Sequence, residues 1–356
     1  RNTKNVPYYV FGRGSLAQLG DLLKPRREAV DGPVVYFVDH FFRDHELIGR
    51  LPMEKGDQLH FVDSSSEPEV TRIDAFKEAV SAADSRTPCC VVGIGGGNAL
   101  DTAKAVANLL TNPGKAEDYQ GWELVKNPAV YKIGIPTLSG TGSECSRTCV
   151  LTNIPKNLKL GMNSDYTVYD QLLLDPDLLA TVPRDQYFYT GIDTFMHCVE
   201  SLQGSYRNAI IDAFSVRAVQ LCEEIFLSDD MMSEENREKM MIASYIGGMA
   251  AGNVGVIHPF SAGLGVVLHV AHGLGNCLAL NVLGDIYPKE YKQFRTMIER
   301  QGVNLPTGIC KDLTEEQYEG LYRGCIVHEK PLTNALGPDF KQILTRENLI
   351  ERYKSI

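Results

Sequence analysis

The segment 91–101, VVGIGGGNALD, constrains the fold of this chain more than any other stretch. It joins an apolar, strand-like run to a helix-like run through the consecutive glycines Gly95, Gly96 and Gly97. Such junctions are typical of folds in which strands and helices alternate. The turn would also let an anion approach the backbone N–H groups at the positive end of a helix. Taken alone, the glycine turn fits a tight strand-to-helix connection as well as a phosphate site, because it lacks the GxGxxG pattern that is typical of dinucleotide-binding turns.

Strand-like and helix-like patterns alternate through the first half of the chain. Short runs rich in apolar residues and β-formers predict strands at 34–39, 58–63, 89–94 and 131–136. Apolar residues at helical spacing predict helices at 41–50, 67–85 and 98–110. A hairpin is expected at 147–164, with its turn at 154–157. The alternation predicts an α/β domain with a parallel sheet and helices on both faces.

The texture of the sequence changes near 176–183, and strand signals nearly vanish after that point. With 356 residues the chain exceeds the usual size of one core, so we expect two domains, 1–178 and 179–356. The second is expected to be entirely helical. Its predicted helices are 184–202, 206–227, 234–252, 256–271, 276–301, 314–328 and 346–354.

Charge and cysteine content exclude several classes of partner. The net charge of −10 and the pI of about 5.4 argue against nucleic acid or an anionic membrane. No apolar run reaches the length needed to span a bilayer. The nine cysteines form no CxxC pair and lie mostly in apolar runs. They indicate reduced thiols and a cytoplasmic protein.

A second loop and an acidic residue add to the evidence for a bound nucleotide. The loop 136–144, PTLSGTGSE, follows a predicted strand and is rich in hydroxyls and glycines, which suit a phosphate and a sugar. Asp39 ends the first clear strand and is the best acid for the ribose hydroxyls of an adenosine. A carboxylate there would repel a 2′-phosphate, which favours NAD over NADP.

Histidines and one aspartate predict a metal site in the second domain. Asp193 and His197 are spaced i,i+4 and therefore share one face of a helix. His258 and His272 follow on an apolar, glycine-rich stretch that is expected to form two elements. One carboxylate and three imidazoles suit Fe²⁺ or Zn²⁺ with a position left open for a substrate oxygen. By spacing alone, His269 remains a rival ligand, although a packing role is the simpler interpretation.

These blocks together resemble the iron-containing (group III) alcohol dehydrogenase family. The resemblance rests on GGGNALDTAK, PTLSGTGSE, GIDTFMHCVES and the His258 and His272 pair, in the family's order and spacing. It implies a Rossmann-like nucleotide-binding domain and a helical metal domain of the dehydroquinate synthase-like architecture, with the site in the cleft. The implied metal ligands are Asp193, His197, His258 and His272. The implied cofactor contacts are Asp39, Gly95, Gly96, Gly97, Asn98, Asp101, Thr137, Ser139, Ser143 and Lys159.

Two positions depart from the family's pattern. Asn98 stands where the family usually has serine, and its backbone N–H can still bind phosphate. Ala262 stands where the family usually has a second histidine, four residues after the third ligand. Its absence leaves the metal ligands intact, but it predicts a changed proton path and a pocket shaped for a different substrate.

The stretches HPFSAGLG and NVPYYVFGRGSL resemble most closely the branch of the family that oxidises C8 of 3-deoxy-α-D-manno-octulosonate (Kdo). That resemblance implies oxidation of a primary alcohol on a sugar acid to an aldehyde. A pyridoxal-phosphate aminotransferase would then form the 8-amino sugar of lipopolysaccharide. The branch is described as an oxidase, but the glycine loops favour NAD as acceptor over O₂. A homodimer is the family-level expectation. Candidate cations for the substrate carboxylate are Arg147, Lys159, Arg207 and Lys330.

Four other functions remain open at this point. One is a general NAD-dependent alcohol or polyol dehydrogenase of the same family. Another is a cyclase of the dehydroquinate synthase type, which the GTGSE block argues against. A metallohydrolase would leave both glycine loops unexplained. A scaffold that binds NAD without catalysis would leave the complete ligand set unexplained.

The predicted metal site is tested by removing two of its members together. Asp193→Ala with His258→Ala should abolish metal binding and turnover while leaving the fold intact, because the site would lose its carboxylate and one imidazole. Metal analysis, circular dichroism and an activity assay measure these three properties. Full activity in the double variant would show that the metal assignment is wrong.

Overall fold

The computed structural model describes residues 4–156 and 158–356, which form two compact units. The first holds the described residues up to Leu138 together with Ser143–Thr181, and is called the α/β unit. The second holds Ser139–Gly142 and Val182–Ile356, and is called the helical unit. The loop 136–144 is therefore divided, because its central residues pack with the helical unit.

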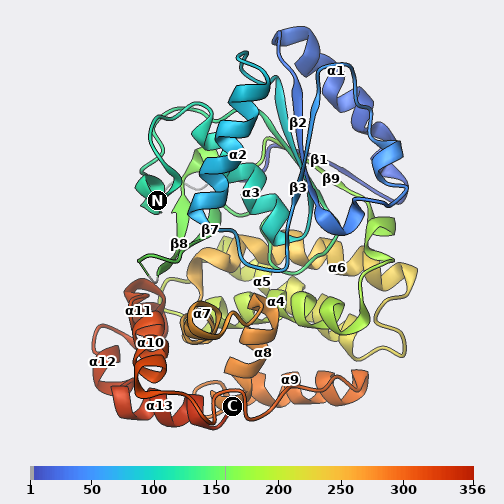
Figure 1. The fold of residues 1–356 in the computed structure, drawn as a ribbon. Coiled ribbons are helices and arrows are strands. Elements are labelled where there is room, and N and C mark those ends of the chain that lie inside the picture. Colours follow the sequence, from blue (N-terminus) through green and yellow to red (C-terminus); the bar gives the residue numbers. More distant parts are fainter. Residues whose placement is uncertain (1–3, 157) are drawn as a thin grey trace. The chain divides into compact units, whose positions relative to one another are not determined.

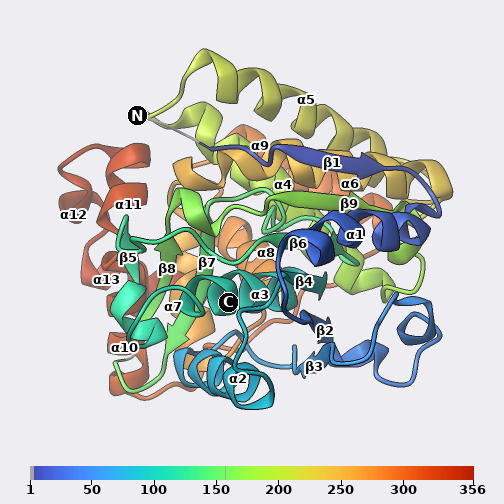
Figure 2. The ribbon, with the colours of Figure 1, turned by 90° about the horizontal axis from the view of Figure 1, so that it is seen from above.

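The α/β unit contains a six-stranded sheet whose strands are all parallel (Figures 1 and 2). The predicted parallel sheet is thus confirmed. In a parallel sheet the carboxyl ends of the strands share one edge, and the loops that follow them gather there. In spatial order the strands are β1 (Tyr8–Phe11), β9 (Gln171–Leu174), β6 (Lys132–Pro136), β4 (Cys90–Gly95), β2 (Val34–Asp39) and β3 (Gln58–Val62).

Helices cover both faces of this sheet, because its central strands are apolar on both sides. On β2, Val35 and Phe37 pack with α2 (Val70–Ala83) and α3 (Gly97–Leu109). The alternate residues Tyr36 and Val38 pack in a second core with α1 (Leu19–Ala29). All four side chains are fully buried, and burial of this kind is the main favourable term in folding.

A small second sheet stands beside α3. It contains β5 (Gly121–Trp122), β8 (Leu158–Asn163) and β7 (Thr148–Asn153). β7 and β8 form the predicted antiparallel hairpin. The predicted turn at 154–157 includes residue 157, which lies outside the described residues.

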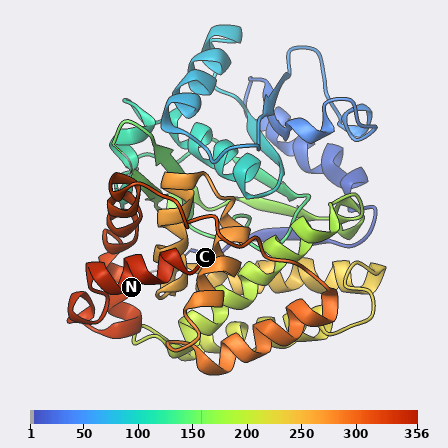
Figure 3. The same cartoon turned by 60° about the horizontal axis from the view of Figure 1, so that its bottom comes forward.

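The helical unit consists of helices joined by turns and loops (Figure 3). This confirms the predicted helical second domain. Its helices are α4 (Arg184–Gln203), α5 (Ala209–Phe226), α6 (Glu234–Gly247), η7 (Gly248–Asn253), α7 (Ile257–Leu268), α8 (His272–Val282), α9 (Pro288–Gln301), α10 (Glu315–Ile326), α11 (Glu329–Leu336), α12 (Phe340–Ile343) and α13 (Arg346–Lys354).

Two predicted helices are wrong in detail. The predicted helix 41–50 is instead two short 3₁₀ turns, His40–Phe42 and Ile48–Arg50. Side chains there accept backbone N–H groups in place of helical carbonyls, as His45 Nδ1 does from Leu47 N at 3.1 Å. The predicted helix 276–301 is interrupted between α8 and α9. Pro288 is the first residue of α9 and cannot continue a helix from the preceding turn.

All nine cysteines are free and buried. In the part of the chain that the structure describes, no single helix is both long and apolar enough to cross a membrane. One bent pair, 234–253 with 257–268, meets the length and composition criteria only when the two segments are combined.

The loop segment Ser139–Gly142 depends on one glycine. Gly140 N–H donates to Ser244 Oγ at 2.7 Å, and its carbonyl accepts from Thr194 Oγ1 at 2.8 Å. Its φ of 147° is one that L-residues rarely adopt, and an added Cβ would lie 1.7 Å from Thr190 O. This part of the loop therefore accepts no side chain at residue 140.

Gly140→Ala should lower the free energy of unfolding by more than about 3 kcal/mol, because both the backbone and its neighbour must shift. Gly252→Ala is the matched control, since nothing lies within 4 Å of a Cβ at that residue. Urea unfolding followed by circular dichroism measures both variants. Equal losses in the two would contradict the packing described here.

Candidate functional site

The four predicted metal ligands come together within the helical unit. Asp193 and His197 lie one turn apart on α4, His258 near the start of α7, and His272 at the first residue of α8. One potential ligand atom from each lies within 4.8 Å of the others. The distances to the Asp193 carboxylate are 3.1 Å from His258 Nε2, 3.4 Å from His272 Nε2 and 3.8 Å from His197 Nε2.

The glycine-rich sequence around His272 explains how α8 reaches this position. A Cβ on Gly273 would lie 2.4 Å from Tyr189 O of α4, and one on Gly275 would lie 2.6 Å from Ser261 Oγ of α7. Only glycine allows so close an approach at these two residues. The sequence HGLGN therefore brings the first turn of α8 against both neighbouring helices.

The break between α7 and α8 lies at His269. This residue has φ 55° and ψ 29°, the left-handed conformation that ends α7. Its side chain is exposed, so the expected packing role for His269 is wrong. It is also absent from the cluster around Asp193. The two elements expected between His258 and His272 are confirmed as α7 and α8, and the proline and glycines of this stretch up to Gly265 lie inside α7 and not at the break.

Charge in the cluster is balanced between one carboxylate and its imidazoles. Burial acts to raise the pKa of Asp193, but His197, His272 and the hydrogen bond from His258 outweigh it and hold the pKa well below its usual range. Burial lowers the pKa of His197 to about 3, so this imidazole is neutral at physiological pH. A neutral imidazole beside an ionised carboxylate is the state in which both can bind a metal.

Glu200 is a further residue of this site, and the sequence analysis missed it. It lies on α4 one turn beyond His197 and is fully buried. Its Oε2 accepts from His258 Nδ1 at 2.5 Å, and its Oε1 accepts from Ile257 N at 2.6 Å. With Nδ1–H donated to Glu200, Nε2 of His258 keeps its lone pair for a metal. The i,i+3 spacing from His197 was the available signal.

Asn276 is the second residue that was missed. It lies one turn after His272 on α8 and is fully buried. Its amide donates to Asp193 Oδ1 at 2.7 Å. The i,i+4 spacing from His272 places it on the same helical face, which was again a usable signal.

The chemistry of the cluster fits a divalent cation. Burial acts to lower the pKa of His258, but the charge of Glu200 and the hydrogen bonds to Asp193 and Glu200 raise it to about 9. Two buried carboxylates thus favour a positive charge at this position, which a metal cation would supply in place of the Nε2 proton of His258. Asp193 Oδ2 is completely buried, and the nearest cationic group to it among the described residues is His272 Nε2, at 3.4 Å and without a hydrogen bond. Buried carboxylates need such compensation, and Fe²⁺ or Zn²⁺ with these donor types would supply it.

In the α/β unit, the glycine turn follows β4 and begins α3. Gly95 has φ 154°, and a Cβ there would lie 2.6 Å from the Cβ of Ala99 and 3.0 Å from that of Asp39. Gly96 is the N-cap of α3 and Gly97 its first residue. Close packing alone therefore requires glycine at residue 95. The first backbone N–H groups of this helix have no acceptor within the helix, and they still suit a phosphate.

Asp39 lies at the end of β2 beside this turn. Its Oδ1 accepts from Phe41 N at 3.0 Å and from Ser64 Oγ at 2.9 Å. The side chain is 15% exposed, so it remains accessible to a ligand. Asn98, in the first turn of α3, donates its amide to the carbonyl of Ser66. The loop after β3 thus contacts both of these predicted cofactor residues.

The hydroxyls of the second loop differ in their surroundings. Thr137 N–H donates to Gly95 O at 3.0 Å, which joins this loop to the glycine turn. The Ser143 hydroxyl donates to Asp101 Oδ1, so these two predicted cofactor residues bind each other. Ser139 Oγ is buried and has no hydrogen-bond partner among the described residues.

The candidate cations for a substrate carboxylate are already paired. Lys159 Nζ lies 3.0 Å from Glu67 Oε1, and Arg147 lies between the carboxylates of Glu123 and Asp165. Arg207 pairs with Asp212 at 2.9 Å, and Lys330 Nζ donates to the carbonyl of Gly252 at 3.3 Å.

Ala262 lies on α7 one turn after His258 and is buried. Its methyl group therefore shares the helical face of that predicted ligand. The imidazole that the family usually has there would add a titratable group next to the cluster.

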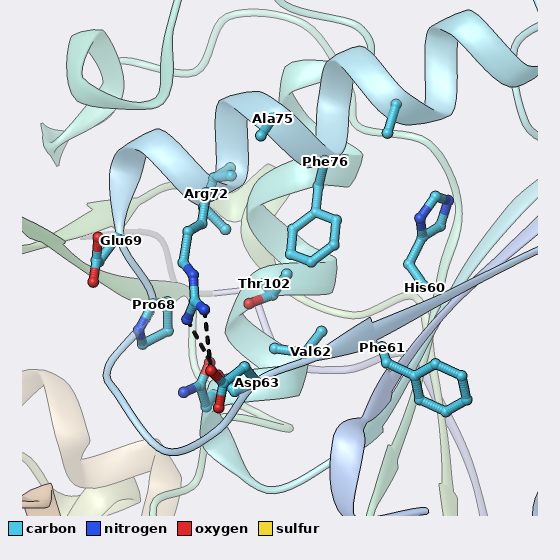
Figure 4. A pocket seen from close by; sticks show the side chains of 13 residues that line it. His60, Phe61, Val62, Asp63, Pro68, Glu69, Arg72, Ala75, Phe76 and Thr102 are labelled. Atoms are coloured by element: carbon cyan, nitrogen blue, oxygen red, sulfur yellow. Dashed lines mark hydrogen bonds and ion pairs between the residues drawn. The ribbon is translucent and has the colours of Figure 1, made fainter. Parts of the chain in front are cut away.

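A pocket of about 340 Å³ lies beneath α2 in the α/β unit (Figure 4). His60, Val62 and Phe76 form part of its wall, and Arg72 points across it to Asp63, at 3.1 Å. Of the predicted cofactor residues only Asn98 lines it, and no predicted metal ligand does. This pocket therefore gives no support to the predicted metal site or to most of the predicted cofactor contacts.

Comparison with protein families matches nearly the whole chain. The family model described as iron-containing alcohol dehydrogenase matches residues 7–176. The model described as the C-terminal part of the Fe-containing alcohol dehydrogenase family matches residues 187–320. The two matches follow one another along the chain without overlap.

Curated relatives include a sulfoacetaldehyde reductase of Bilophila wadsworthia. It is 34% identical over 220 residues, which cover 60% of this chain and 56% of that relative. An NAD-dependent methanol dehydrogenase of Bacillus methanolicus is 29% identical over 278 residues, covering 76% of this chain and 71% of the relative. The first match thus spans little more than half of the relative's length.

Solved structures share the whole fold. A sulfoacetaldehyde reductase from Bifidobacterium kashiwanohense in complex with NAD⁺ has a TM-score of 0.80 at 24% identity, covering 99% of this chain and 97% of that one. An alcohol dehydrogenase from Oenococcus oeni has a TM-score of 0.83 at 21% identity, covering 99% of both chains.

Glu200→Gln should weaken metal binding roughly 10- to 100-fold, because the charge that orients His258 is lost while the size of the side chain is kept. Glu290→Gln on α9 is the control, since Glu290 is also buried but lies outside the cluster. Competition with a chelator, followed by the absorption of bound Co²⁺, measures affinity in both variants. Unchanged affinity in the Glu200 variant would show that this carboxylate does not orient the ligand.

Proposed function

Because the chain belongs to the iron-containing alcohol dehydrogenase family, whose members are oxidoreductases acting on CH–OH groups, we propose that it is a metal-dependent, NAD-linked alcohol dehydrogenase. The observation that carries the proposal is the cluster of Asp193, His197, His258 and His272 around one buried carboxylate. A cluster of this composition suits one divalent cation, either Fe²⁺ or Zn²⁺.

The bound metal would supply a Lewis acid that lowers the pKa of an alcohol, and NAD would accept the hydride. Asp193 and the three imidazoles hold the cation, and Glu200 keeps the His258 ring in place through Nδ1. The side chain of His272 is 30% exposed, against 11% for His258 and 5% for His197. The alcohol therefore reaches the cluster from the side of His272.

The cofactor is NAD, held by the glycine turn and by Asp39. Backbone N–H groups at Gly96 and Gly97 bind the diphosphate at the start of α3. The carboxylate of Asp39 binds the ribose hydroxyls and repels a 2′-phosphate. Ser139 is a further candidate contact, because its buried hydroxyl has no hydrogen-bond partner among the described residues. Lys159 would contact the nicotinamide ribose, held in position by Glu67.

The substrate class is a small alcohol or its aldehyde. The relatives act, by their names, on methanol and sulfoacetaldehyde, so both neutral and anionic substrates belong in a test. The finer proposal within this class is the C8 alcohol of Kdo, whose aldehyde product would pass to a pyridoxal-phosphate aminotransferase. Because the side chain of Ala262 is a single methyl group, it leaves room for a bulkier substrate than a histidine at this position would. The protein would act as a homodimer.

Three other functions make different predictions. A cyclase would release phosphate from a seven-carbon keto-acid phosphate. A metallohydrolase would need the metal but not NAD, and a non-catalytic scaffold would bind NAD without holding a metal. The donor set around Asp193 argues against the scaffold, and the two glycine loops argue against the hydrolase.

The experiment is a panel of short alcohols, polyols and sugar acids including Kdo, each with NAD or NADP and with Fe²⁺ or Zn²⁺. Absorbance at the NADH wavelength should rise with NAD and an added metal, and a chelator should abolish the rise. With NADP the rate should be at least about tenfold lower, because of Asp39. Oxygen uptake without NAD, or phosphate release, would overturn the proposal.

A further inference from the structure

Lys104 is a buried charge that the proposed chemistry leaves without a role. It lies in the second turn of α3, and none of its side chain is exposed. Lysine is almost never fully buried unless its ammonium is paired, because an ammonium taken out of water must recover its hydrogen bonds. The groups that surround Lys104 Nζ therefore indicate what it does.

Main-chain carbonyls of one segment surround this ammonium. Nζ donates to Ser143 O at 2.8 Å, to Ser146 O at 3.2 Å and to the carbonyl of Thr148. It also lies 3.3 Å from Ser146 Oγ and 3.4 Å from Asp101 Oδ1. A single side chain thus gathers three carbonyls from residues 143–148, the end of the second loop and the start of β7.

Asp101 fastens the same segment from one turn earlier on α3. Its Oδ1 accepts from the Ser143 hydroxyl, and its Oδ2 accepts from Val150 N at 2.8 Å. Lys104 and Asp101 are spaced i,i+3 and so lie on one face of the helix. Within 143–150, the Asp101 carboxylate binds hydrogen-bond donors and the Lys104 ammonium binds carbonyl acceptors.

The helix that holds this segment is also the helix that begins at the glycine turn. Both predicted cofactor loops are therefore attached to α3. The glycine turn continues into its first residues, and the second loop is held by Asp101 and Lys104. The bond from Thr137 N to Gly95 O joins the loops at their other ends. A shift of 143–148 on α3 would move Ser143 relative to the glycine turn.

We propose that Lys104 is a positioning residue for the dinucleotide cofactor. It does not touch the cofactor. Its ammonium holds the carbonyls of 143–148 so that the second loop and the glycine turn keep a fixed spacing. This inference rests on the proposed function, because it assumes that these loops bind NAD. A methionine of similar length would remove the ammonium that these three carbonyls and Asp101 share.

The test compares Lys104→Met with Lys132→Met in the full-length, metal-loaded protein. Lys132 is the matched control: it is 2% exposed, belongs to the same unit and pairs with Asp170, at 3.4 Å. It starts β6, at the opposite end of that strand from Thr137. Calorimetric titration with NAD gives the Kd, and metal analysis and thermal unfolding are recorded for each variant.

In Lys104→Met the Kd and KM for NAD should rise about tenfold or more, as the loss of charge-assisted hydrogen bonds would produce. Metal content should stay at the wild-type value, and kcat at saturating NAD should change less than KM. In Lys132→Met the Kd for NAD should stay within about twofold of wild type, even if the unfolding midpoint falls equally.

Equal NAD affinity in the two variants would overturn the positioning role. If Lys104→Met does not fold, Lys104→Gln provides the same comparison, since it keeps amide donors on a shorter side chain. Failure of the wild-type protein to bind NAD would instead overturn the proposed function. The two failures are therefore distinguishable within one set of titrations.

Discussion

The buried carboxylate of Asp193 is the constraint on which the helical unit depends. An ionised group with no exposed surface must be compensated, and the compensation here comes from imidazoles on α4, α7 and α8. Those helices must approach closely, which accounts for glycine at residues 273 and 275. Glu200 adds a second buried charge behind His258. One cation at the cluster would satisfy both carboxylates, so the packing and the proposed chemistry have the same electrostatic origin.

The fold was largely predictable because its signals are local. The runs 34–39 and 90–95 are apolar on both faces, which is typical of strands in a parallel sheet covered on both sides. The helix expected at 41–50 failed because the Asp39 and His45 side chains accept backbone N–H groups in that segment. In that segment, side-chain hydrogen bonds to the backbone outweighed the helical spacing of the apolar residues. The spacing alone does not reveal such hydrogen bonds.

The site was predictable only in part, since residue type does not show what a side chain contacts. Spacing and family resemblance selected four residues that the fold does bring together, and their role as ligands stays a prediction. Asp101 and Ser143 were expected at the cofactor, but they bind each other and fasten the second loop to α3. The role of Lys104 could not be predicted from its motif, because it depends on carbonyls that follow about forty residues later.

X-ray absorption of the iron- or cobalt-loaded protein tests the central claim most directly. One metal per chain, with a first shell of nitrogen and oxygen only and the outer-shell scattering of imidazole rings, is the expected result. The nine buried cysteines offer an alternative set of ligands. Sulfur in the first shell, or a shell without imidazole scattering, would contradict a metal centre built on Asp193 and its histidines.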